Sequence, residues 1–140
     1  YGADGQKLRD EGNEYGSTTG RPRRCGWLDM VALKYSIMLN GVTQLVMTKV
    51  DVLNQFEEIK VATAYNTHHG KSTELPFNLE KADPVYKSIK GWNQSLENIR
   101  DKDALPHALT DYIQWIENET GVPVTMISIG PDRKQIIMMR

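Results

Sequence analysis

The chain has 140 residues, about the length of one domain, with 39% hydrophobic and 25% charged side chains and a formal net charge of −1. This composition describes an ordinary soluble protein with a modest core and excludes most unusual classes. No apolar stretch approaches the roughly 18 residues of a membrane span, and the balanced charge predicts neither a nucleic-acid nor a membrane partner. The single cysteine, Cys25, cannot form an internal disulfide and fits a reducing compartment, so we expect a cytoplasmic protein.

The first 26 residues are predicted to form a loop, because they contain six glycines and a basic cluster but no long apolar run. The chain opens on Tyr1 within this polar run rather than on Met, so we expect a fragment with further residues upstream. From Trp27 to Leu39 the apolar side chains recur at helical spacing, and an Asn-Gly pair follows. This pattern predicts a helix with Asp29 in its first turn.

Residues 59–65 are predicted to be the first strand of an antiparallel hairpin. Their side chains alternate, and one face carries Ile59, Val61, Thr63 and Tyr65. A turn at residues 66–70 leads into a second strand that ends near Pro76, and proline places that strand at a sheet edge. The turn contains His68 and His69 but no third ligand at metal-binding spacing, so no metal site is expected.

The carboxyl-terminal half is predicted to contain one well-defined helix and two short strands. Between residues 79 and 100 the pattern is mixed and indicates only short helices. A better helix begins at Pro106, where proline suits the first turn, and stops at Gly121. Short apolar strands are expected at residues 124–128 and 135–139.

The predicted fold class is α/β, with part of a mainly parallel sheet flanked by helices and an antiparallel hairpin. The parallel part rests on Leu45–Met47, a continuous apolar run that is typical of a strand covered on both faces. We expect residues 1–140 to form a single structural unit.

The segment STTGRPRR, residues 17–24, combines hydroxyl groups, a flexible glycine and three guanidinium groups directly before the predicted helix. Arginine forms bidentate bonds to carboxylate or phosphate, and a helix N-terminus presents unpaired N–H groups with a partial positive charge. These groups favour an anionic ligand, whose binding we expect Arg23→Ala to weaken. A solvated basic turn that caps the helix is the alternative interpretation.

The segment TKVD, residues 48–51, follows the expected parallel strand at the end where ligands of open α/β sheets usually bind. Guanine presents N1–H and an exocyclic amine side by side, and one ionised carboxylate can accept both. Asp51 is therefore a candidate guanine selector, and the stem of Lys49 can cover the base, as in the N/T-K-x-D motif of GTP-binding proteins. A salt-bridged surface turn is the alternative.

The segment SIGP, residues 128–131, also follows an apolar strand. Its backbone N–H groups and its glycine can reach a purine edge or a ribose. A tight turn without a ligand is the alternative.

Six blocks resemble, in order and spacing, the carboxyl-terminal third of adenylosuccinate synthetase: STTGRPRRCGWLD, LVMTKVDVL, EIKVATAY, PVYKSIKGW, YIQWIENETGVPV and ISIGPDR. Members of this family join IMP to L-aspartate with GTP and Mg²⁺, first phosphorylating the 6-oxygen of IMP and then displacing the phosphate with the aspartate amine. The resemblance implies that the chain is the corresponding part of such a ligase of AMP biosynthesis.

By position, the resemblance implies a mobile substrate-loop region at residues 1–26 ahead of an α/β portion at residues 27–140. The aspartate and IMP contacts it implies are Ser17, Thr18, Thr19, Gly20, Arg21 and Arg23. The GTP contacts it implies are Arg23, Lys49, Val50, Asp51, Ser128, Ile129 and Gly130. Val50 and Ile129 depart from the commoner Leu and Thr of the family, at positions whose side chains need not touch the base.

The family's glycine-rich phosphate loop, its catalytic Asp and His and its Mg²⁺ ligands have no counterpart in this sequence. We therefore expect no catalytic residue here and no turnover by the chain alone, and we expect the full-length enzyme to be a homodimer. The competing class is a non-enzymatic module whose cluster from Arg21 to Arg24 binds RNA or another anion. Guanine preference lost in Asp51→Ala favours the synthetase, and salt-sensitive binding of mixed RNA favours the module.

Overall fold

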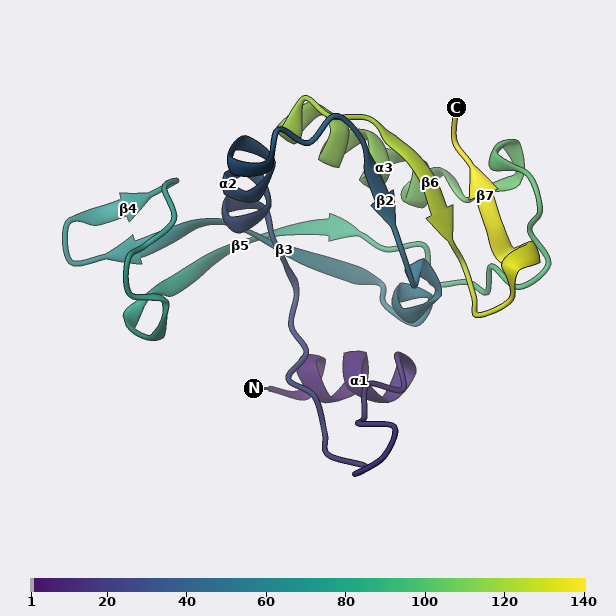
Figure 1. Ribbon diagram of the computed structural model, residues 1–140, viewed down its shortest axis with the longest axis horizontal. Helices are drawn as coiled ribbons and strands as arrows, with labels where there is room; N and C mark the ends of the chain where they lie inside the picture. Colours follow the sequence, from purple (N-terminus) through teal and green to yellow (C-terminus); the bar gives the residue numbers. More distant parts are fainter. Residues whose placement is uncertain (1) are drawn as a thin grey trace.

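The computed structural model describes residues 2–140, and for Glu80 it describes the backbone alone. Tyr1, which prompts the expectation of a fragment, lies outside the described residues. Within this range two small sheets and three α-helices form a mixed α/β fold, which confirms the predicted class (Figure 1). None of these helices is long and apolar enough to cross a membrane.

The first sheet is built around β3 (Glu58–Thr67). This strand pairs in antiparallel fashion with β4 (Gly70–Ser72) and β5 (Asp83–Lys90), and in parallel with the short β1 (Leu28–Asp29). The pairing of β3 with β4 confirms the predicted hairpin, although β4 ends before the expected Pro76.

The second sheet contains the strand predicted to be parallel. β2 (Leu45–Met47) runs parallel to β6 (Val124–Ser128), and β7 (Ile136–Met138) pairs antiparallel to β6. All three strands are therefore confirmed. Within residues 2–140 only one face of β2 is covered, because Leu45 and Met47 are half-buried whereas Val46, on the other face, is 54% exposed.

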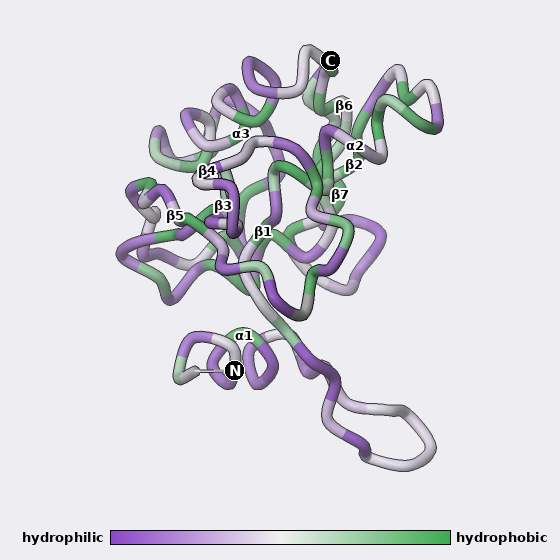
Figure 2. The backbone as a smooth tube through the Cα atoms, turned by 90° about the vertical axis from the view of Figure 1, so that its left-hand side faces the viewer, coloured by the Kyte–Doolittle hydropathy of each residue, from purple (hydrophilic) through white to green (hydrophobic). Residues whose placement is uncertain are grey.

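The helices lie on both sides of β3 and β5. α2 (Met30–Asn40) and α3 (His107–Thr120) lie on one side, and α1 (Ala3–Glu11) lies on the other (Figure 1). The apolar face of α3 enters the main core with Leu109, Tyr112, Ile113 and Ile116. Burial raises the pKa of Tyr112 to about 12. Figure 2 shows that most hydrophobic stretches lie around the two sheets and their covering helices α2 and α3, away from α1.

α1 shows that the loop predicted for residues 1–26 is wrong over its first half. Leu8 is the one residue of α1 that is buried, so the helix has almost no apolar periodicity to recognise. Polar contacts hold it instead: Nζ of Lys7 donates to the carbonyl of Gln55 at 2.6 Å and lies 4.3 Å from the centre of the Phe56 ring. These partners lie far along the chain, so local pattern does not reveal them.

The helix predicted from Trp27 begins at Met30, because Asp29 is its N-cap rather than a residue of its first turn. The backbone of Asp29 is extended, and its Oδ1 accepts the N–H of Ala32 at 3.0 Å. Its Oδ2 accepts the hydroxyl of Tyr65 from β3. The helix ends at the predicted Asn-Gly pair.

β3 does not keep the predicted alternation. Its pairing with β5 shifts between Ala62 and Ala64, and the shift changes which side chains face inward. Thr63, expected on the face of Ile59 and Val61, lies in this shift and is half-buried. The buried residues of β3 are Ile59, Val61, Ala62, Ala64 and Tyr65.

β5 is absent from the sequence prediction, which gives only short helices for residues 79–100. A short 3-10 helix is present at Leu79–Lys81, but β5 follows it directly. This strand pairs with β3 alone, and its side chains are exposed or half-buried. A strand with so few buried side chains carries little hydrophobic pattern, and the backbone ladder determines its place.

Candidate functional site

The carboxyl ends of the parallel strands bring two predicted nucleotide contacts together. Lys49 follows β2 and Ser128 ends β6, and the backbone N–H of Lys49 donates to Oγ of Ser128 at 2.9 Å. Lys49 has a φ of 57°, a left-handed conformation that is uncommon for a residue with a side chain. The chain then enters a 3-10 helix at Val50–Leu53. The TKVD segment therefore leaves the sheet at the edge where the sequence predicts a ligand.

Asp51 lies in this 3-10 helix with an unsatisfied carboxylate oxygen. Its Oδ1 is buried, yet it has no hydrogen-bond partner among the described residues. Leaving a buried acceptor without a partner costs about 1–3 kcal/mol. A ligand that brings N–H donors to this oxygen would remove that cost. Asp51, the candidate guanine selector, therefore has a carboxylate oxygen without a donor among the described residues.

The remaining residues of the two nucleotide motifs have packing roles. The side chains of Val50 and Ile129 lie in the core, at 1% and 2% exposure. Gly130 lies against Gln135, where an added Cβ would be 2.3 Å from Oε1. That oxygen also accepts the N–H of Asp132 at 3.0 Å, so a side chain at position 130 would displace the Gln135 amide from this contact.

Residues 14–23 form a narrow loop beside α1. The N–H of Arg23 donates to the carbonyl of Glu14, and the N–H of Gly16 donates to the carbonyl of Arg21, both at 2.9 Å. The pale loop in Figure 2 extends away from the rest of the chain. Its exposed tip carries Ser17, Thr18, Thr19 and Gly20.

Glu14 joins this loop to the nucleotide motif. Its Oε2 accepts a hydrogen bond from Nη1 of Arg23 at 2.8 Å, and its Oε1 accepts one from Nζ of Lys49. Nζ of Lys49 also donates to the carbonyl of Gly12, at the end of α1, at 2.6 Å. The ammonium of Lys49, followed by the guanidinium of Arg23, holds the pKa of Glu14 below its usual range. The sequence gives little sign of Glu14, which is a single acid three positions before the STTGRPRR segment.

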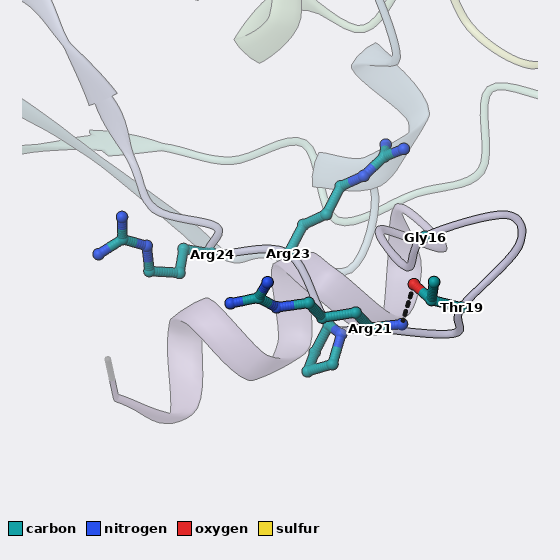
Figure 3. Close-up of a pocket in the computed structure, with 6 residues that line it drawn as sticks. Gly16, Thr19, Arg21, Arg23 and Arg24 are labelled. Atoms are coloured by element: carbon teal, nitrogen blue, oxygen red, sulfur yellow. Dashed lines mark hydrogen bonds between the residues drawn. The ribbon is translucent and has the colours of Figure 1, made fainter.

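The three guanidinium groups of the loop do not converge on one point. Figure 3 shows the side chain of Arg23 pointing away from those of Arg21 and Arg24. An open pocket of about 830 Å³ lies along the loop, lined by Gly16, Thr19, Arg21, Pro22, Arg23 and Arg24. The lining is cationic, and binding of an anion there stays a prediction.

The N-terminus of α2 is not part of this anion site, contrary to the prediction. The carboxylate of Asp29 already caps it, and β1 separates the basic loop from the helix. The alternative, in which the basic turn caps the helix, is wrong for the same reason.

No group of three or more His, Cys, Asp or Glu side chains within residues 2–140 could hold a metal ion. His68 and His69 are exposed at the turn between β3 and β4.

Comparison with known proteins agrees with this geometry. The family model described as adenylosuccinate synthetase matches residues 2–137. The adenylosuccinate synthetase of Cytophaga hutchinsonii is 55% identical over 141 residues, and that of Aquifex aeolicus is 49% identical over 142 residues. Each alignment covers 99% of this chain and 33% of the relative. A solved structure of fully ligated adenylosuccinate synthetase from Plasmodium falciparum matches with a TM-score of 0.90 at 35% identity, over 99% of this chain and 34% of that chain.

The sequence and the fold thus agree on a class of protein, the synthetases, which are ligases. The chain belongs to the adenylosuccinate synthetase family. It spans about a third of the length of the relatives it matches.

Proposed function

We propose that this chain is the substrate-recognition part of a GTP-dependent ligase. The ligase joins IMP and L-aspartate to form adenylosuccinate in AMP biosynthesis. Membership of the family supports the reaction, and the residues that meet at the edge of the second sheet support the role of this part. The groups that transfer the phosphoryl group and bind Mg²⁺ belong to the rest of the enzyme, a cytoplasmic homodimer. We refer to that complete protein as the whole synthetase.

The observation that carries the guanine assignment is the buried, unpartnered Oδ1 of Asp51. Guanine offers two adjacent N–H donors, at N1 and at the exocyclic amine, and an ionised carboxylate accepts both. Adenine has an acceptor at N1, which would face the lone pairs of the carboxylate. The site therefore prefers guanine nucleotides to adenine nucleotides. Lys49 covers the base, and Ser128 holds the turn that carries Lys49.

The backbone supplies the remaining guanine-nucleotide contacts. Because the side chains of Val50 and Ile129 are in the core, these residues meet the nucleotide through their N–H and C=O groups. Gly130 contributes its backbone N–H and C=O groups, while the Gln135 amide occupies the space where a Cβ would lie.

The loop supplies the contacts to the smaller substrates. Thr18, Thr19 and Arg23 bind the carboxylates of L-aspartate, and Arg21 lies by the ribose of IMP. Ser17 and Gly20 complete the tip, which is exposed and thus able to close over a ligand. Arg23 also reaches GTP, since Glu14 already links its side chain to Lys49.

Asp51→Asn tests the guanine assignment. The amide keeps one acceptor and gains an N–H donor, which repels the exocyclic amine of guanine but fits the C2 carbonyl of xanthine. In the whole synthetase, calorimetry should show GTP binding weakened by about 10- to 100-fold and a gain in affinity for xanthosine triphosphate.

Asp111→Asn, an exposed substitution on α3, is the matched control and should leave the nucleotide preference unchanged. Equal binding of GTP and ATP by the unsubstituted protein would contradict the proposal. Salt-sensitive binding of mixed RNA that depends on Arg21 and Arg24 would favour the binding-module alternative instead.

A further inference from the structure

Glu14 lies at the junction of two segments that are far apart in the sequence. Arg23 belongs to the substrate loop and Lys49 to the nucleotide motif, and each uses one oxygen of the same carboxylate. The side chain of Glu14 is 24% exposed, against 60% for Arg23 and 50% for Lys49. The acid is thus the inner member of the trio, and the two cations extend outward from it.

The surrounding contacts fix both cations from a second side. The carbonyl of Gly12 accepts Nζ of Lys49 at 2.6 Å, so this ammonium rests on the C-terminal end of α1. Nε of Arg9 donates to the carbonyl of Arg23 at 2.7 Å, which anchors the backbone from which the guanidinium extends. Glu14 adds the contact that orients the charged ends of both side chains.

We propose that Glu14 is a positioning residue that holds Arg23 and Lys49 in the orientation in which they meet GTP. The inference rests on the proposed function, because it takes GTP as the ligand of both cations. Long cationic side chains lose rotamer freedom when they bind a ligand, and side chains held in advance lose less. Glu14 therefore strengthens nucleotide binding without touching the nucleotide.

Because Glu14 is negatively charged, the direction in which nucleotide affinity changes when it is neutralised tests the proposal. The trio carries two positive charges and one negative charge, so replacing Glu14 by a neutral residue makes the site more positive. Coulomb attraction alone then predicts tighter binding of an anionic nucleotide. Loss of positioning predicts weaker binding.

The experiment compares Glu14→Gln with Glu11→Gln in the whole synthetase, by calorimetry with GTP and ATP. Glu11 is an exposed acid on α1 three positions earlier, so its loss changes the net charge equally. We expect Glu14→Gln to weaken GTP binding by about tenfold and to weaken ATP binding by a similar factor. The preference for guanine should remain, because Asp51 sets it. Glu11→Gln should leave both affinities within about twofold.

A second set of variants separates positioning from a general structural role. In the background of Lys49→Met, the effect of Glu14→Gln should shrink to a few-fold, because one of its two cations is gone. Glu14→Asp keeps the charge but is one methylene shorter, so it should give an intermediate loss and covers the case in which Glu14→Gln fails to fold. If Glu14→Gln acted only by lowering the stability of the protein, it would weaken GTP binding by the same factor in the Lys49→Met background as in the unsubstituted protein.

Unchanged or tighter GTP binding in Glu14→Gln would overturn the inference and leave the proposed function standing. Failure of the proposed function is seen earlier, in the unsubstituted protein, as an absence of guanine preference. In that case the inference falls with it.

Discussion

At the residue scale, the side chain of Asp29 connects α2 and β3, two elements that are separate in the sequence. One carboxylate oxygen caps α2 through the N–H of Ala32, and the other accepts the hydroxyl of Tyr65 in β3. Burial, followed by the contact with Asp29, raises the pKa of Tyr65 far above its usual range, so this hydroxyl remains a donor. The contact fixes where α2 starts and how it meets the first sheet.

Asp29→Ala should destabilise the chain by about 1–3 kcal/mol, because it removes an N-cap and leaves a partly buried hydroxyl without its acceptor. Denaturant unfolding of the 140-residue chain measures this loss. Asp29→Asn keeps a good capping oxygen and should lose clearly less. Equal stability of Asp29→Ala and the unsubstituted chain would show that the contact does not contribute.

At the element scale, the close approach between the end of β5 and the start of β3 decides how the first sheet is built. Gly91 directly follows β5, and its N–H donates to the carbonyl of Glu57 at 2.8 Å. A Cβ at this glycine would be 1.9 Å from the carbonyl oxygen of Phe56. Backbone occupies the space, so no side-chain movement can relieve the clash.

Gly91→Ala should therefore destabilise the chain by about 1–3 kcal/mol or more, since the backbone of β3 or β5 must shift. Gly26→Ala is the matched control, because an added Cβ there meets nothing within 4 Å. Thermal unfolding of the two variants gives the comparison. A Gly91→Ala chain as stable as Gly26→Ala would contradict the close approach.

At the scale of the whole molecule, the proposed recognition groups gather at one sheet edge, and α2 carries exposed apolar side chains. Asp51, Lys49 and the loop meet at one sheet edge, whereas Met38 and Leu39 of α2 are 67% and 63% exposed. Metal-binding clusters are absent from residues 2–140. Because the chain spans about a third of the length of its relatives, we propose that recognition and chemistry lie in different parts of the whole synthetase.

The 140-residue chain alone should form no detectable adenylosuccinate from IMP, L-aspartate and GTP, whereas the whole synthetase should form it. Positioning groups without groups for phosphoryl transfer give binding but no turnover. Chromatographic assay of the product checks this. Product formed by the isolated chain, at a rate proportional to its concentration, would refute the division of roles.

The sequence by itself determined the elements whose stabilisation is local or strongly patterned. α3 has a complete apolar face and a terminal glycine, and the apolar run of β2 predicts a strand of a parallel sheet, although its pairing with β6 is known only from the structure. Because a motif at the end of such a strand must emerge at the sheet edge, the positions of Lys49, Asp51 and Ser128 could also be predicted.

Only the tertiary structure decided the features whose partners lie far along the chain. α1 and β5 bury few side chains and depend on contacts with Gln55, Phe56 and β3, which no local pattern encodes. The apolar stripe of α2 is visible in the sequence, but which part is covered depends on its neighbours. Glu14 became a candidate only when folding placed Arg23 and Lys49 on its two oxygens, because a single acid carries no periodicity and its role is defined by what surrounds it.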